Sequence, residues 1–127
     1  MPEPFVFITN HTIKEGKLDH FKALSREFVD FVEANQPRPI AFHIYVDEKG
    51  DHATLVQIHP DADSMEFHLQ MTGDQINEAL EIVENESIQV YGTPGDRARG
   101  LLRTIAESGV PVSIKAYPMG GFARPAP

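Results

Sequence analysis

Apolar and polar residues alternate along residues 40–46, with apolar side chains on one face and smaller or polar ones on the other. A period of two is typical of a β-strand. Gly50 follows within a polar turn, and a second, less regular apolar segment occupies residues 52–59. Glycine accepts the positive φ that tight turns need, so the pattern predicts a β-hairpin. Pro60 ends the hairpin, and Asp61 or Asp63 can cap a following helix.

Two other segments repeat apolar residues at steps of three and four, which is the spacing of a helix packed on a core. The first predicts a helix over about 17–34. Its apolar members are Leu18, Phe21, Leu24, Phe28, Phe31 and Val32. The second contains Met65, Leu69, Thr72, Ile76, Leu80 and Val83. Because Gly73 lies inside this second segment, we expect it to divide into two helices near 72–74.

Shorter apolar segments complete the chain. Strands are predicted over 5–9, 87–91 and 112–117, and a short helix is predicted to end at Gly109. The resulting order, βαββα(α)β followed by αβ, predicts an α+β protein with a ferredoxin-like split βαβ unit and an antiparallel sheet. We expect a single domain over 1–117 and a Pro/Gly-rich C-terminal tail over 118–127.

The predicted sheet has helices on one face, and its other face is partly apolar. If paired hairpin residues sum to 99, three residues of each hairpin strand share that second face. They are Ala41, His43 and Tyr45 with Thr54, Val56 and Ile58. An apolar open face on a sheet indicates a partner subunit. The sequence therefore predicts a homodimer.

Composition narrows the class of protein. The chain has 127 residues, which suits one domain, and no cysteine, which excludes disulfides and thiolate metal sites. Its net charge of −8 disfavours a nucleic-acid partner, since phosphates require clustered Lys and Arg. We expect no metal, no membrane partner and a cytoplasmic location, because neither a long apolar run nor a signal-peptide pattern is present.

The chain resembles the antibiotic-biosynthesis monooxygenase family of dimeric α+β barrels over residues 5–117. The resemblance rests on the order of elements and on four local stretches. These are Lys14-Glu15-Gly16-Lys17 before the first helix, the hairpin ending at Pro60, Ser64-Met65-Glu66-Phe67-His68-Leu69, and Gly120-Gly121-Phe122-Ala123-Arg124. Because this family includes quinol-type monooxygenases, haem-degrading enzymes and members without established activity, the fold alone does not define the function.

The resemblance implies a homodimer whose two sheets face each other as a barrel, with a pocket between sheet and helices in each subunit. It also implies cofactor-independent oxygenation of a small aromatic or quinol substrate, which is deprotonated and itself reduces oxygen. The alternative is a non-catalytic, small-ligand-binding or stress-associated homodimer of the same fold. No cofactor is expected in either case.

His68 is the first candidate for catalysis, because it borders the apolar stripe of its helix and an imidazole titrates near neutrality. The competing interpretation is a buried histidine bonded to a backbone carbonyl. Asn10, at the end of the first strand, is the second catalytic candidate, or else a turn-forming residue. His59, Gln57 and Tyr91 are candidates for substrate binding, although each also fits ordinary packing.

Haem degradation is disfavoured by the resemblance itself. Asn10 matches the asparagine of that branch, but Leu80 stands near the position of its iron-binding histidine, and leucine cannot ligate iron. His20 and His52 are expected at the surface. Motifs for phosphate binding, Rossmann redox chemistry and triad hydrolysis do not occur.

Overall fold

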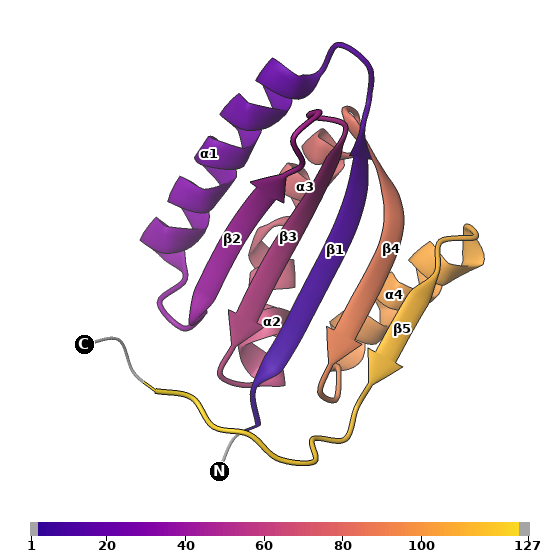
Figure 1. Cartoon of the computed structure of the whole chain (residues 1–127). Helices are drawn as coiled ribbons and strands as arrows, with labels where there is room; N and C mark the ends of the chain where they lie inside the picture. Colours follow the sequence, from indigo (N-terminus) through magenta and orange to yellow (C-terminus); the bar gives the residue numbers. More distant parts are fainter. Residues whose placement is uncertain (1–2, 125–127) are drawn as a thin grey trace.

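The computed structural model describes residues 3–124, which form one sheet and four helices (Figure 1). In chain order the elements are β1 (Phe5–Ile13), α1 (Leu18–Asn35), β2 (Ala41–Val46), β3 (His52–His59), α2 (Ala62–Met71), α3 (Gly73–Ala79), β4 (Val83–Tyr91), α4 (Asp96–Glu107) and β5 (Val112–Lys115). The strands lie in the order β2-β3-β1-β4-β5. β1, the first strand of the chain, therefore lies at the centre of the sheet.

The first four strands pair antiparallel in the ferredoxin-like arrangement, which confirms the predicted fold class. β5 pairs parallel to β4, so the complete sheet is mixed. The hairpin register is also confirmed, because Ala41 pairs with Ile58 and Tyr45 with Thr54, each pair summing to 99. This register fixes which side chains of β2 and β3 face the helices.

The helices all cover one face of the sheet (Figure 1). Phe5, Phe7 and Thr9 of β1 are buried beneath them, whereas the intervening Val6 and Ile8 point to the other face and are half-buried. Two clusters of buried side chains form the core on the helical side. One centres on Phe7, Met65 and Val90, and the other on Phe21, Leu24 and Val83.

The segment after the hairpin forms two helices, as Gly73 predicted. Asp61 caps α2, since its Oδ1 accepts the Ser64 backbone N–H at 2.9 Å. At the other end of α2, the buried Thr72 hydroxyl donates to the carbonyl of His68 at 2.8 Å. α3 begins at the next residue. This sharp junction holds His68 and α3 over the same side of the sheet.

Two strands are longer than the sequence predicts. β1 extends past Thr9 to Ile13, and β4 begins at Val83 rather than 87. Of their additional pairs, His11 with Asn85 and Thr12 with Glu84 are polar, and Ile13 with Val83 is apolar; opposite Asn10 and His11 the register with β4 shifts by one residue. β5 ends at Lys115, two residues earlier than predicted. Residues 118–124 have no helix or strand, and residues 125–127 of the predicted tail lie outside the described residues.

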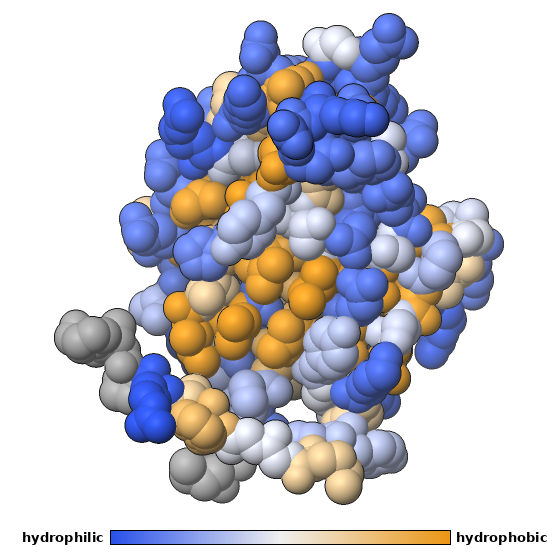
Figure 2. Space-filling view, in the orientation of Figure 1, coloured by the Kyte–Doolittle hydropathy of each residue, from blue (hydrophilic) through white to orange (hydrophobic). Residues whose placement is uncertain are grey.

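The face of the sheet opposite the helices is divided into an apolar and a polar part. Figure 2 shows an orange apolar patch over its centre and lower part, with blue hydrophilic side chains above. Val6, Ile8, Val56 and Ile58 pair across β1 and β3 within the apolar part. We call these four residues, with Tyr91, the open-face patch. Within residues 3–124, none of the helices has the length and apolar character that crossing a membrane demands.

Candidate functional site

A cavity of about 490 Å³ lies between the helical face of the sheet and helices α1 to α4. Its walls are mostly apolar and include Leu24, Phe28, Met65, Leu69 and Ile76. This size and lining are typical of sites for small organic ligands. The sheet contributes Phe7, Thr9 and Gln57 to one side of the cavity, and the helices contribute the other side.

His68 of α2 lines this cavity and is 1% exposed. The rings of Phe28 and Phe42 lie 6.0 and 5.5 Å from its ring, centroid to centroid. His68 Nδ1 lies 2.9 Å from Gln36 Oε1. An amide oxygen only accepts hydrogen bonds, so Nδ1–H donates and Nε2 is left as an acceptor. The competing interpretation from sequence, a bond to a backbone carbonyl, is replaced by this side-chain bond.

Burial lowers the pKa of His68 to about 3, and the neighbouring His59 adds to the shift. The expectation of a pKa near neutrality is therefore wrong. The cause is tertiary: two phenylalanine rings from α1 and β2 exclude water from an imidazole that a helical stripe alone would leave half-exposed. At neutral pH His68 is an uncharged hydrogen-bond acceptor.

His59 and Gln57 form a second polar group beside His68. His59 Nε2 lies 3.0 Å from Gln57 Oε1, and His59 Nδ1 lies 2.7 Å from Ser64 Oγ. Nε2–H therefore donates to Gln57, and the Ser64 hydroxyl donates to Nδ1. Because its oxygen is occupied, Gln57, which lines the cavity, has its amide Nε2–H groups left to bind a ligand.

His59 itself is 0% exposed and does not line the cavity. Burial lowers its pKa to about 4; Arg38 lowers the pKa further, whereas Asp61 opposes the shift. Its partner Ser64 is also buried and is not part of the cavity wall. The hydrogen bond between His59 and Ser64 fixes the His59 ring, which in turn orients Gln57. Neither His59 nor Ser64 can contact a ligand in the cavity in this conformation.

The structure does not bring Asn10 and Tyr91 to this cavity. Thr9 and His11 face the helices, so the alternation of β1 turns Asn10 to the opposite face. There its Nδ2 donates to Ser87 Oγ at 3.0 Å and to Gln89 Oε1 at 2.9 Å. Tyr91 pairs with Val6 on that same open face.

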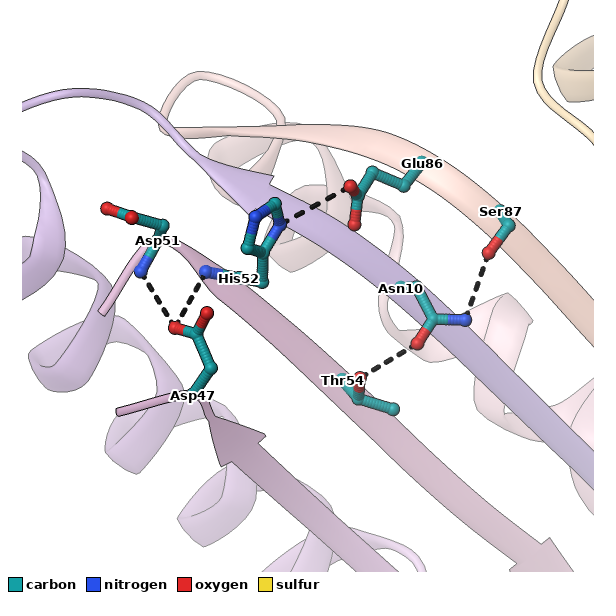
Figure 3. A network of polar contacts seen from close by, with 7 residues as sticks. All are labelled: Asn10, Asp47, Asp51, His52, Thr54, Glu86 and Ser87. Carbon is teal, nitrogen blue, oxygen red and sulfur yellow. Dashed lines mark hydrogen bonds and ion pairs between the residues drawn. The ribbon is translucent and has the colours of Figure 1, made fainter. Parts of the chain in front are cut away.

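Asn10 belongs to a polar network on the open face (Figure 3). Thr54 Oγ1 donates to Asn10 Oδ1 at 2.8 Å, and His52 Nδ1 lies 3.3 Å from Glu86 Oε1 near the hairpin turn. Asn10 is therefore neither a turn residue nor a neighbour of His68. It joins three strands through side-chain bonds.

His11 is a cavity residue that the sequence reasoning missed. It lines the end of the cavity near Asn85, with its Nε2 3.0 Å from Thr9 Oγ1. Burial lowers the pKa of His11, although Asn85 and Glu86 oppose the shift. The available signal was the period of two through Phe5, Phe7, Thr9, His11 and Ile13, which ending the strand at Thr9 concealed.

No group of three or more His, Asp or Glu side chains suited to a metal ion occurs among residues 3–124. The polar groups of the cavity are instead imidazoles, amides and hydroxyls, together with two glutamates at its opening. This set can bind and orient a hydroxyl or carbonyl group and can accept a proton.

The fold is that of the antibiotic biosynthesis monooxygenase-like proteins of known structure. MupZ from Pseudomonas fluorescens matches with a TM-score of 0.74 and 19% identity, over 97% of this chain and 96% of that one. SnoaB from Streptomyces nogalater, a cofactor-independent oxygenase, matches with a TM-score of 0.61 and 14% identity, over 74% of this chain and 96% of SnoaB.

An antibiotic biosynthesis monooxygenase of known structure matches with a TM-score of 0.61 and 18% identity, over 72% of this chain and 99% of that one. Family models and curated protein sequences give no match. At these identities the likeness concerns the fold, and the chemistry must be argued from this chain's own side chains.

Proposed function

We propose that the chain is a cofactor-independent monooxygenase that takes a small aromatic or quinol-type substrate into the central cavity. The observation that carries this proposal is the uncharged His68 imidazole, whose Nε2 is free to accept a proton in an apolar, largely water-excluding wall. The fold shared with SnoaB, a cofactor-independent oxygenase, supports the same function.

In this proposal His68 Nε2 accepts the proton of a substrate hydroxyl or acidic ring CH, and the Gln57 amide donates to the adjacent oxygen. The resulting carbanion or phenolate supplies electrons to O₂. In an anthrone-type substrate a ring CH₂ becomes C=O, one oxygen atom enters the product and the other leaves as water. The low pKa of His68 opposes charging it alone, but the new anion beside it favours the imidazolium strongly in so apolar a site.

Oxygen uptake with a panel of quinols and anthrones tests this function. We expect uptake with at least one member, and a loss of roughly 100-fold in kcat for His68→Gln, which removes the proton acceptor but keeps a polar side chain. His20→Gln, at an exposed position of α1, is the matched control and should retain activity. Wild-type protein that consumes no oxygen with any member of the panel contradicts the proposal.

A second candidate function is ligand binding without catalysis. It is favoured by the depressed pKa of His68 and by its bond to Gln36, which also suit a histidine that merely completes the wall. Tight binding of an aromatic ligand that His68→Ala leaves undiminished, together with no oxygen uptake, would establish this function instead.

We also propose that the protein is a homodimer joined through the open-face patch. The patch has no helix over it, and the described part of the tail adds three further exposed apolar side chains, Tyr117, Met119 and Phe122. In Figure 1 this segment passes below the lower edge of the sheet, close to the patch. A contiguous apolar surface of this kind is typical of protein interfaces.

A further inference from the structure

We propose that the central cavity selects uncharged ligands and rejects anionic ones, with Glu27 and Glu78 as the residues that set this preference. The inference rests on the proposed function in so far as it concerns the same cavity. The inference goes beyond the proposed function because it defines the charge of the substrate. Free carboxylic acids, phosphate esters and coenzyme-linked acids are excluded, and neutral hydroxyaryl ketones, esters and quinols are favoured.

The charged residues in the wall of the cavity are of one sign. Glu27 of α1 and Glu78 of α3 both line it and are both exposed, so they lie where the cavity opens to solvent. Glutamate carries a negative charge at neutral pH. Among the described residues, no Lys or Arg side chain contributes to the cavity wall. An entering anion therefore meets repulsion at the opening and finds no fixed cation inside.

The interior cannot readily supply a positive charge either. Burial lowers the pKa of His68 to about 3 and also lowers the pKa of His11, so both imidazoles that line the cavity are neutral at pH 7. An unpaired charge moved from water into such surroundings is strongly disfavoured. The remaining polar partners, such as the Gln57 amide, suit the hydroxyl and carbonyl groups of a neutral molecule.

Neutral selection agrees with proton abstraction inside the cavity. A substrate that enters uncharged and gives its proton to His68 leaves the total charge of the cavity unchanged, because cation and anion form together. A ligand that enters already ionised brings an uncompensated charge. The cavity therefore tolerates an ion pair that forms inside it but disfavours a single anion that enters from water.

A matched pair of fluorescent naphthols tests the inference directly. Methyl 6-hydroxy-2-naphthoate and 6-hydroxy-2-naphthoate share one aromatic body and differ by the charge of the carboxyl group. Binding is followed by naphthol fluorescence at pH 7.5 under nitrogen, so the result does not depend on oxygenation. We expect the ester to bind roughly 100-fold more tightly than the acid.

Charge reversal at the opening identifies the responsible residues. In the double variant Glu27→Lys/Glu78→Lys, we expect the ratio of the two affinities to fall by about 10-fold, with the remaining affinity for the acid weakened by salt. The matched control is Glu33→Lys/Glu107→Lys, which makes the same change in net charge at exposed positions outside the cavity wall. It should leave the ratio unchanged.

Three outcomes would overturn the inference. One is equal or tighter binding of the acid by the wild type, and another is an equal effect of the control and opening variants. The third is failure of the ester to bind up to its solubility limit. If only the oxygenase proposal is wrong, the result is different: the protein takes up no oxygen, but it still binds the ester more tightly than the acid.

Discussion

Two buried histidines, His59 and His68, lie with ring centroids 5.9 Å apart. Each has its own amide partner, Gln57 for His59 and Gln36 for His68, and neither can hold a proton easily beside the other. Both pKa values are lowered, to about 4 and about 3, with burial as the main cause. The folded protein therefore keeps the pair neutral under conditions in which an unfolded chain would protonate both.

This pair makes stability depend on pH. Because the folded pKa values lie below the unfolded value of 6.5, the unfolded chain binds more protons, and stability falls as pH drops below 6.5. We expect the free energy of unfolding to decrease by about 2 kcal/mol for each histidine between pH 7 and pH 5. Urea unfolding at several pH values measures this slope.

His68→Gln should reduce that slope, whereas His20→Gln at an exposed position should not. The comparison concerns the change with pH within each variant, so a lower stability of His68→Gln at pH 7 does not affect it. A wild-type stability that stays constant between pH 7 and pH 5 would show that the two imidazoles are not held neutral by burial.

For single residues, the sequence predicted which side chains lie at the cavity better than it predicted their pKa values. His68, at the border of the apolar stripe of α2, and Gln57, a polar residue of an apolar strand, were candidates for the site, and both line the cavity. The pKa of His68 could not be predicted, because the rings that bury it come from Phe28 and Phe42, far away in the chain. Asn10 was misplaced because the predicted strand ended at Thr9, whereas β1 continues to Ile13.

Helix α4 begins at a carboxylate supplied by another helix. Glu66 of α2 accepts the backbone N–H groups of Arg97 and Ala98 at 2.7 and 3.0 Å. The capping position, Gly95, has no side chain of its own for this task, and a Cβ there would lie 2.6 Å from the Glu66 carboxyl carbon. Glu66 thus satisfies free amide groups and places a negative charge at the positive end of the helix.

We expect Glu66→Ala to lower the free energy of unfolding by about 1–2 kcal/mol, since it removes both bonds and the charge. Chemical denaturation measures the loss. Glu107→Ala, at the exposed last residue of the same helix, is the control and should change stability by no more than about 0.5 kcal/mol. Equal effects of the two substitutions would contradict a capping role for Glu66.

The elements were predictable where apolar periodicity was strong, as in α1, the hairpin and the α2–α3 pair. The strand ends were not. Two of the outer pairs of β1 and β4, His11 with Asn85 and Thr12 with Glu84, are polar, and the register shift opposite Asn10 and His11 interrupts the period of two along β4. A strand that satisfies its polar side chains through bonds to neighbouring strands looks like a loop in the sequence.

The whole molecule presents two unlike faces, one packed under helices and one open. On the open face, the open-face patch adjoins the Asn10 network of Figure 3, because the pair Ile8–Val56 lies two residues along the strands from the pair Asn10–Thr54. Two copies related by a twofold axis can match apolar with apolar and polar with polar surface. A stable dimer needs about 800 Å² from each partner, which a five-stranded face can provide.

We expect the wild type to sediment at low micromolar concentration with about twice the 14.2 kDa mass of one chain. Val56→Asp places a charge at the centre of the patch and should give monomers or aggregates. Thr93→Asp, at an exposed turn after β4, adds the same charge elsewhere and should remain dimeric. A well-folded wild-type species near the mass of one chain would refute the dimer.

The central place of β1 also governs when the sheet can form during synthesis. β1 is synthesised before the other strands of the sheet, yet it pairs with β3 and β4, and Asn10 bonds to Gln89, 79 residues later. β1 can pair with β3 once residue 59 has been made, but its other edge stays unpaired, and Phe5 and Phe7 lack the cover of Ile88 and Val90, until β4 has been made. Late pairing of this kind slows folding and exposes apolar strands to other chains in the interval. A nascent chain that stops before β4 would present the cavity's floor without the strand that completes it.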